Sequence, residues 1–454
     1  MSDFHAISPL DGRYRQKLAH LSDYFSEFAL MRSRVQVELR YLLVLDAAGL
    51  FAPLNHAEKQ AIERQLNQFT DEDYRQIKEI ESRINHDVKA CEMFLRQRLG
   101  LRQPNMIHFG LTSEDVNNLA YTLLLKEYLE REQLPQLQSL LEQLATLAES
   151  WCAVPFPART HGQMASPTTG GKEMAVYINR LLRVYRSLRA FRFRSKLNGA
   201  TGNFSALVAA FPQYDWIEFS RQFLQSLDLE YNPATTQIED HDTWGAYFAI
   251  VRQLNNILLD FDRDMWLYLT LGYLVMEADA GAVGSSTMPH KVNPINFENS
   301  EGNLQISVAL LNGITDKLGN SRLQRDLSDS TVERNMGVAL AHGYLAVQET
   351  MKGLKRLRIN EARCRAELRE HPELLAEPIQ TILRREGFDN PYELLKEITR
   401  GKRVSFEDLQ QFIRGLDVPT AVKEELLKLK VETYTGLAEK ICREVLRELK
   451  NETE

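Results

Sequence analysis

Three long stretches of the chain carry apolar residues at helical spacing, and this periodicity limits the folds open to it. Apolar side chains recur every three to four residues, at Leu134, Leu137, Leu141, Leu144 and Ala148, at Met174, Ile178, Leu181, Tyr185 and Leu188, and at Ile250, Leu254, Ile257, Phe261 and Met265. Such spacing over several turns is typical of long helices that pack side by side at shallow angles. From about residue 117 to 359 we therefore predict helices almost throughout, without hairpin strands.

The overall pattern predicts an all-α fold of three helical domains. These are an N-terminal domain over residues 1–111, a central long-helix bundle over 112–360 and a small C-terminal domain over 361–454. The first contains an apolar helical run over residues 28–45 and a second helix over 71–80. In the last, charge density rises and glycine and proline return, which favours shorter helices. Central helices that are apolar on several faces also predict self-association.

Bulk properties exclude several classes of function. A net charge of −7 leaves no general basic surface for nucleic acid. The longest uncharged apolar run, residues 265–276, is too short to span a bilayer. Cys91, Cys152, Cys364 and Cys442 form no C-x-x-C pair, which indicates reduced thiols. No H-E-x-x-H spacing occurs among the ten histidines, so we expect no metal. Without a signal peptide, we expect a soluble cytoplasmic protein without nucleic-acid or membrane partners.

Polar motifs interrupt the N-terminal region at two places. Arg13 and Tyr14 follow a Pro/Asp/Gly turn, which alone indicates only a surface turn. Asn85, His86 and Asp87 come just before a helical run. The asparagine or aspartate there would be a suitable helix cap, and a lone histidine is usually structural.

A third motif, T-S-E-D, predicts a helix start. Thr112 or Ser113 suits the capping position, and Glu114 and Asp115 place acids in the first turn. The free amides at such a start favour an anion. A structural cap and a carboxylate-binding role are therefore compatible at this position.

The breaks between the central helices carry further polar groups. Residues 154–167 contain three prolines and a glycine, so we predict a loop that presents Thr160, His161 and Gln163. Residues 232–239 offer Gln237. Residues 321–334 carry a cluster of cationic and hydroxyl side chains, namely Arg322, Arg325, Ser330 and Arg334. For this last segment, ordinary ion pairs with Asp326 and Asp329 are the alternative interpretation.

The segment Gly284–Pro294, G-S-S-T-M-P-H-K-V-N-P, concentrates the most chemistry. Its two prolines exclude a regular helix or strand, and the small residues at its start allow close approach to a ligand. Lys291 and Asn293 suit a carboxylate of the substrate, and the serines are donors or a base.

This segment resembles the signature loop of the fumarase/aspartase superfamily, and His290 after Met-Pro is similar to the adenylosuccinate lyase family within it. The resemblance extends over nearly the whole chain. It implies a homotetramer with a multi-helix core and active sites each built from three chains. It also implies β-elimination of fumarate from adenylosuccinate, giving AMP, and from succinylaminoimidazole carboxamide ribotide, giving the free carboxamide. The implied substrate-binding residues are Arg13, Tyr14, Asn85, His86, Asp87, Thr112, Ser113, Gln237, Lys291, Asn293, Arg325, Ser330 and Arg334.

Such an elimination needs a base, an acid and a site for a developing aci-carboxylate. It leaves the oxidation state unchanged, so we expect no cofactor. We assign His161 as the acid, with His86 as the rival, because imidazole titrates near neutrality. We assign Ser285 as the base, and its preference over Ser286 comes from the resemblance alone. The alternatives are another superfamily activity, such as that of argininosuccinate lyase, aspartase or fumarase, or a non-catalytic protein on the same scaffold.

Overall fold

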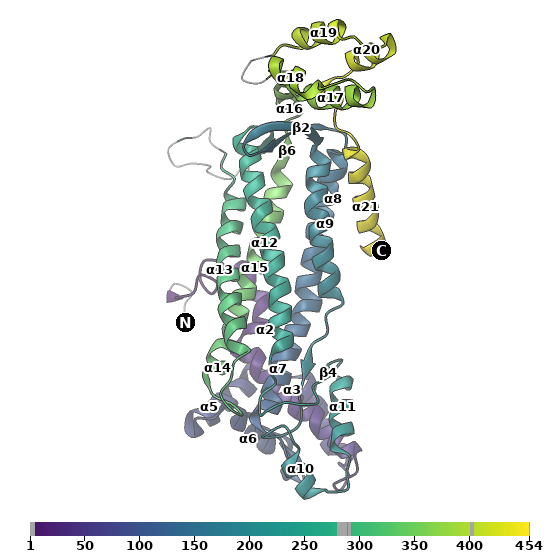
Figure 1. Cartoon of the computed structure of the whole chain (residues 1–454). Coiled ribbons are helices and arrows are strands. Elements are labelled where there is room, and N and C mark those ends of the chain that lie inside the picture. The colour runs from purple at the N-terminus through teal and green to yellow at the C-terminus, as the bar shows by residue number, and fades with distance from the viewer. Residues whose placement is uncertain (1–4, 279–287, 289–291, 400–403, 454) are drawn as a thin grey trace. The chain divides into compact units, whose positions relative to one another are not determined.

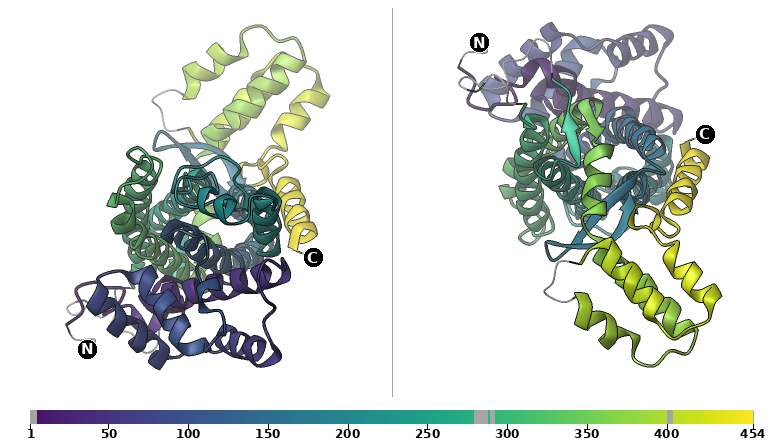
Figure 2. Two further views of the ribbon diagram at one scale, coloured as in Figure 1. Left: turned by 90° about the horizontal axis from the view of Figure 1, so that it is seen from below. Right: turned by 90° about the horizontal axis from the view of Figure 1, so that it is seen from above.

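The structure, a computed structural model, describes residues 5–278, 288, 292–399 and 404–453. Its contacts divide the chain into two compact units. Unit 1 comprises Met1–Gln136, Val184–Asn256 and Gly302–Ala346, and unit 2 comprises Leu137–Arg183, Ile257–Glu301 and Val347–Glu454. Figure 1 labels most of the helices and some of the strands, and Figure 2 gives two further views. The predicted boundaries of three domains stay a prediction.

Long helices dominate the described residues, which confirms the all-α prediction. The longest that contribute residues to both units are α8 (Leu134–Ser150), α9 (Gly170–Arg189), α12 (Asp242–Thr270), α13 (Ile295–Leu318) and α15 (Met336–Arg356). The apolar positions of the three predicted runs are buried except for Leu134 and Ile250, which are half-buried. The 3.6-residue period therefore located the core faces of these helices correctly.

Unit 1 adds a set of helices before the long ones and between them. These are α1 (Arg15–Leu18), α2 (Ser22–Phe25), α3 (Glu27–Ala47), α4 (His56–Asn67), α5 (Asp71–Ile84), α6 (Asp87–Leu99), α7 (Ser113–Tyr128), α10 (Ser205–Ala210), α11 (Trp216–Ser226) and α14 (Ser328–Glu333). The helices predicted near residues 28–45 and 71–80 are α3 and α5. Helix α7 joins α3 through a bond from Ser33 Oγ to the Ala120 carbonyl at 3.1 Å. It joins α12 through a bond from Trp244 Nε1 to Thr122 Oγ1 at 3.0 Å.

Unit 2 packs its parts of the long helices around aromatic and polar contacts. The rings of Tyr177 on α9 and Phe261 on α12 meet edge to face at 5.0 Å. Thr350 on α15 donates to Asp262 on α12 at 3.0 Å, and burial raises the pKa of this aspartate well above its usual value. Buried groups of this kind are stable when they are hydrogen-bonded.

The C-terminal part of unit 2 consists of short helices, as predicted. They are α16 (Glu361–Arg369), α17 (Ala376–Arg385), α18 (Pro391–Thr399), α19 (Phe406–Gly415), α20 (Thr420–Leu427) and α21 (Ala438–Thr453). A cluster of buried aliphatic side chains joins α16, α17, α19 and α20, and includes Leu368, Ile379, Leu383, Leu409, Ile413 and Leu426. This apolar cluster gives the short helices their own core.

The prediction of a loop over residues 154–167 was wrong. Strand β1 (Pro155–Thr160) pairs antiparallel with β2 (Gln163–Thr169), and only His161 and Gly162 connect them. Both connecting residues have positive φ, at 54° and 76°, as a two-residue hairpin turn requires. Each strand of a two-stranded sheet has a free edge, where proline is tolerated. Proline is also tolerated at bulges, and the register is irregular between Phe156 and Ala158.

Two further small sheets occur among the described residues. Strands β3 (Arg194–Ser195) and β4 (Glu230–Tyr231) run parallel. Strands β5 (Leu274–Met276) and β6 (Leu357–Ile359) run antiparallel. Each has two strands, so they join segments locally and do not form a layer of the fold.

Candidate active site

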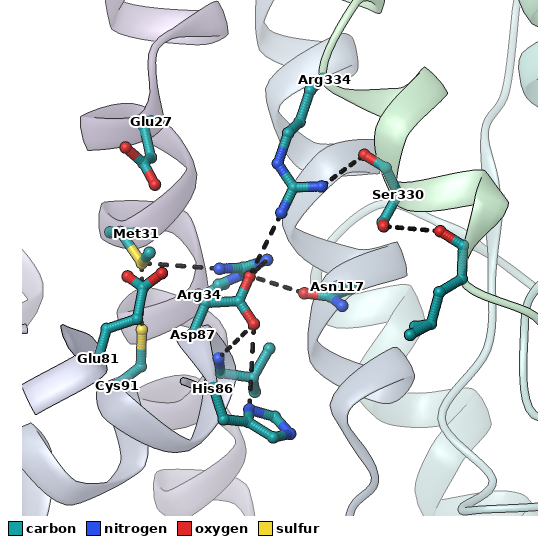
Figure 3. Close-up of polar contacts among 12 residues, drawn as sticks. Glu27, Met31, Arg34, Glu81, His86, Asp87, Cys91, Asn117, Ser330 and Arg334 are labelled. Carbon is teal, nitrogen blue, oxygen red and sulfur yellow. Dashed lines mark hydrogen bonds and ion pairs between the residues drawn. The ribbon is translucent and has the colours of Figure 1, made fainter. Parts of the chain in front are cut away.

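Asp87 is the centre of a charged cluster in unit 1. Its Oδ2 lies 2.8 Å from Nη2 of Arg34 on α3 and 3.8 Å from Nη2 of Arg334, the residue that ends α14. Figure 3 shows the carboxylate between the two guanidinium groups. Partial burial by itself would raise the pKa of Asp87, but the charge of Arg34 and the Val88 amide lower it. Asp87 is therefore held as a carboxylate next to two cations.

His86, the neighbour of Asp87, is the N-cap of α6. Its Nδ1 accepts a hydrogen bond from the Lys89 amide at 3.1 Å, so the expectation that Asn85 or Asp87 would cap the helix was wrong. Asn85 instead ends α5 in the left-handed conformation, with φ of 54°. This conformation reverses the chain direction between the two helices and leaves the His86 side chain about half exposed, at 51%.

Arg34 connects this cluster to helix α7. Its Nε donates to Asn117 Oδ1 at 2.9 Å, and Asn117 in turn donates to Glu114 Oε1 at 2.7 Å. The same Glu114 oxygen lies 2.8 Å from Nη2 of Arg325. A continuous set of polar contacts thus links Asp87, the first turn of α7 and the arginine segment 321–334.

The start of α7 is as predicted. Thr112 is the N-cap, and its amide donates to Asp115 Oδ2 at 2.8 Å. Oδ1 of Asp115 accepts from the amides of Asn198 and Gly199 at 3.0 and 3.2 Å, and lies 3.0 Å from Lys196 Nζ. The side chains of Asp115 and Lys196 have no exposed area. This buried ion pair fixes residues 196–199 against the helix start that presents Thr112 and Ser113.

Gln237 joins the same region through residue 200. Its Nε2 donates to the Ala200 carbonyl at 3.1 Å. Close by, Asn198 donates to Thr235 Oγ1 at 2.8 Å. Gly202 has φ of 74°, and a Cβ there would lie 2.1 Å from the Thr235 carbonyl oxygen. Glycine is needed at this position because the two segments approach so closely.

The arginine segment contains one accessible cation and one enclosed cation. The Arg334 side chain is 54% exposed and donates from Nη1 to the Ser330 carbonyl at 2.6 Å. The Arg325 side chain is only 18% exposed, and its buried Nε has no hydrogen-bond partner. Asp329 lies 3.9 Å from that Nε. Arg322 Nη1 lies 3.5 Å from Asp326 Oδ2, so the predicted alternative of ion pairs with Asp326 and Asp329 is present, together with the link to Glu114.

A pocket of about 330 Å³ opens beside the Asp87 cluster. Arg34, Asp87, Tyr121, Glu333 and Arg334 line its polar side. Burial, then the charges of Glu114 and Asp329, raise the pKa of Glu333. With Glu333 protonated, the charges that line the pocket are the cations Arg34 and Arg334 and the carboxylates Asp87 and Glu27, which balance.

Arg13 and Tyr14 lie in the turn that precedes α1. Arg13 is exposed, and the Tyr14 amide donates to the Pro9 carbonyl at 2.9 Å. Their predicted contact with substrate stays a prediction.

The remaining predicted residues belong to unit 2. His161 is exposed at the tip of the β1–β2 hairpin. Asn293 lies just before α13, and it takes part in an interaction with another residue. Ser285 and Lys291 fall outside the described residues, as does His290. The structure therefore brings together segments 85–87, 112–113, 237 and 325–334 in unit 1, and presents His161 in unit 2.

Sequence reasoning missed two of the side chains that hold this site together. Arg34 occupies a buried position on α3 in line with Leu30, Val37 and Tyr41, so a charge on an apolar stripe was the available signal. Lys196 has no comparable signal, because its partner Asp115 lies far away in sequence.

The described residues contain neither a metal-binding cluster nor a membrane-spanning helix. Over residues 5–278, 288, 292–399 and 404–453, no group of three or more His, Cys, Asp or Glu is arranged to hold a metal ion. In the same part of the chain, every helix is too short or too polar to cross a membrane.

The fold and the site place the chain among the fumarase/aspartase-type lyases. A family model described as "Lyase" matches residues 12–307, and one described as "Adenylosuccinate lyase C-terminal" matches residues 321–435. Solved structures share this fold, and two of them are compared with the chain as follows. The 3-carboxy-cis,cis-muconate lactonizing enzyme from Pseudomonas putida has a TM-score of 0.77 and 20% identity, with coverage of 96% of this chain and 98% of that one. Fumarate lyase from Mesorhizobium has a TM-score of 0.78 and 17% identity, with coverage of 94% of this chain and 97% of that one.

Relatives that match over nearly their full length identify one family within this class of lyases. The chain is 45% identical to adenylosuccinate lyase of Haemophilus influenzae over 446 residues, which covers 96% of this chain and 98% of the relative. It is 45% identical to adenylosuccinate lyase of Escherichia coli K12 over 447 residues, with the same coverage. Adenylosuccinate lyase of Legionella pneumophila (strain Corby) is 43% identical over 451 residues, which covers 98% of this chain and 99% of the relative. The chain belongs to the adenylosuccinate lyase family.

Proposed function

We propose that this chain is an adenylosuccinate lyase that eliminates fumarate from adenylosuccinate and from succinylaminoimidazole carboxamide ribotide. The observation that carries the proposal is the polar network of unit 1. It joins Asp87 to Arg334 and Glu114 to Arg325, and so gathers the segments expected to bind a succinyl nucleotide. Near-full-length identity to enzymes with this name supports it.

The network suits the charges of such a substrate. The Arg334 side chain is 54% exposed, so its guanidinium has donors for a nucleotide phosphate, and the enclosed Arg325 adds a second positive charge to the same segment. Ser330 lies one helical turn before Arg334, and its hydroxyl would exchange its bond to the Leu327 carbonyl, 3.0 Å long, for one to the phosphate. The amides at the start of α7, beside Thr112 and Ser113, favour a succinyl carboxylate.

The elimination uses a base and an acid. Ser285, as alkoxide, takes the proton from the carbon next to the carboxylate, and the electron pair moves onto that carboxylate as the aci form. Lys291 and Asn293 stabilise this charge. The carbon–nitrogen bond then breaks, the nitrogen takes the bonding pair, and His161 supplies its proton. No electron is lost or gained overall.

The hairpin turn gives His161 a suitable place for this role. A two-residue turn projects its side chain beyond the strands, and His161 is exposed there. His86 is the rival donor, but its Nδ1 already accepts from the Lys89 amide. That bond restricts its ring to donation from Nε2.

Association into homotetramers with shared active sites is part of the proposal. Large apolar side chains are exposed on the long helices, at Val176, Trp266, Leu267, Ile295 and Ile306. Burial of these side chains against another subunit would remove apolar surface from water. A cytoplasmic location is also proposed, supported by four free, buried cysteines.

The test is ultraviolet monitoring of the purified protein with adenylosuccinate, argininosuccinate, aspartate or malate. Turnover of adenylosuccinate is expected, and activity on only one of the other three would overturn the substrate assignment. His161→Gln and Ser285→Ala should bind substrate and lose turnover, whereas His56→Gln on α4 and Ser286→Ala are matched controls that should stay active.

Mixing the two inactive variants tests the sharing of sites. If His161 and Ser285 of one site come from different chains, mixed tetramers contain some intact sites and recover activity. Mixtures that exchange subunits, as shown by mass, and remain inactive would refute shared sites.

A further inference from the structure

Three side chains from distant parts of unit 2 meet beneath the hairpin that carries His161. Arg159 belongs to β1, Tyr273 lies between α12 and β5, and Glu367 belongs to α16. The Tyr273 hydroxyl accepts from Nε and Nη2 of Arg159 at 3.1 and 3.0 Å. It donates to Glu367 Oε1 at 2.7 Å, and Arg159 Nη2 donates to the same oxygen.

Arg159 also reaches the turn itself. Its Nη1 donates at 3.1 Å to the carbonyl oxygen of Gly162, which follows His161 directly. One planar guanidinium therefore bonds the Gly162–Gln163 peptide of the turn on one side and the tyrosine–glutamate pair on the other. Arginine suits this task because its donors are held in a rigid plane.

The groups behind Arg159 are buried and hydrogen-bonded. Tyr273 is fully buried, and its carbonyl accepts from the Asn360 amide at 2.8 Å. The Glu367 side chain is 7% exposed, and its second oxygen accepts from Arg363 at 2.6 Å. Burial, and the bond to Glu367, raise the pKa of Tyr273 to about 12. The hydroxyl is thus protonated, as its donation to Glu367 requires.

We propose that Arg159, Tyr273 and Glu367 are positioning residues that set the orientation of the His161 turn for proton donation. The inference rests on the proposed function of His161. The hairpin turn accounts for the φ of 54° at His161, but it leaves the turn's orientation relative to the rest of unit 2 to contacts made outside the hairpin. The Gly162 carbonyl bond supplies such a contact.

The alternative is that these contacts only anchor helix α16. Kinetics separate the two roles, because misplacement of a catalytic group by about 1 Å costs about 100-fold in rate. Arg159→Met should lower kcat by about 10- to 100-fold while KM for adenylosuccinate changes by less than about threefold. Tyr273→Phe removes only the hydroxyl and should lower kcat by a smaller factor. Arg159→Lys should recover part of the loss, since it keeps the charge without the planar set of donors.

A matched control uses the same helix. Arg369→Gln removes an α16 ion pair with Glu432 that does not involve the hairpin, and its kcat should equal that of the wild type. Wild-type kcat in Arg159→Met and Tyr273→Phe, or an equal loss in Arg369→Gln, would overturn the positioning role.

Hydrogen exchange gives a readout independent of activity. Amides of residues 155–169 should exchange faster in Arg159→Met than in the wild type, and at the wild-type rate in Arg369→Gln. Unchanged exchange in Arg159→Met overturns the inference even if the wild type has no lyase activity. A wild type inactive on adenylosuccinate, with faster exchange in Arg159→Met, refutes the proposed function but not the structural basis of the positioning role.

Discussion

Replacement of Arg34 by Met should destabilise the protein strongly, because it removes a buried cation and leaves Asp87 without its main partner. Arg34 is 2% exposed and bonds both Asp87 and Asn117. Removal of one member of a buried ion pair costs about 3–5 kcal/mol. The Asp87 side chain retains 28% exposure and has Arg334 at 3.8 Å, so we expect the lower end, about 3 kcal/mol.

A double-mutant cycle isolates this interaction. Asp87→Asn removes the unpaired charge, so Arg34→Met combined with Asp87→Asn should be less destabilised than the sum of the single variants, by about 2 kcal/mol. The control is Arg75→Met, because Arg75 and Glu72 are both more than half exposed. Exposed pairs of this kind contribute at most about 1 kcal/mol.

Urea unfolding followed by circular dichroism measures these free energies. All variants must be compared at one protein concentration, since the proposed subunit association would make apparent stability concentration-dependent. A loss below about 1 kcal/mol in Arg34→Met, or a coupling near zero, would refute the view that this buried pair supports the site.

Two further variants test other parts of unit 1 by thermal unfolding. Gly202→Ala should cost about 3 kcal/mol, because it combines a left-handed φ with a Cβ placed 2.1 Å from the Thr235 carbonyl. Gly199→Ala is its control, since a Cβ there meets nothing closer than 3.8 Å, and equal losses in the two would contradict the steric argument. Glu333→Gln should flatten the dependence of stability on pH. Burial raises the pKa of Glu333 in the folded state, so the folded wild type binds more protons than the unfolded chain. The wild type therefore loses stability as the pH rises from the unfolded-state pKa of Glu333 to its raised folded-state pKa. The melting temperature of Glu333→Gln minus that of the wild type should therefore rise as the pH rises from about 5 to about 9. If the two melting temperatures change in parallel with pH, Glu333 does not titrate in this way.

Sequence reasoning succeeded where the information was local. The apolar stripes of α8, α9 and α12 follow from a 3.6-residue period, and the start of α7 follows from Thr112 and the acids after it. It failed for the hairpin of residues 155–169, because three prolines outweighed the two-residue His-Gly turn that was also visible. The same local view assigned the cap of α6 to Asn85 or Asp87, whereas His86 accepts the bond.

The sequence by itself determined the long helices, their buried faces and the family, because helical period and contiguous motifs are carried by neighbouring residues. Only the tertiary structure decided which charges meet. Asp87 with Arg334, Glu114 with Arg325, and Asp115 with Lys196 are pairs whose members lie far apart along the chain. Electrostatic partners depend on distance in space and on burial, and the order of residues encodes neither directly.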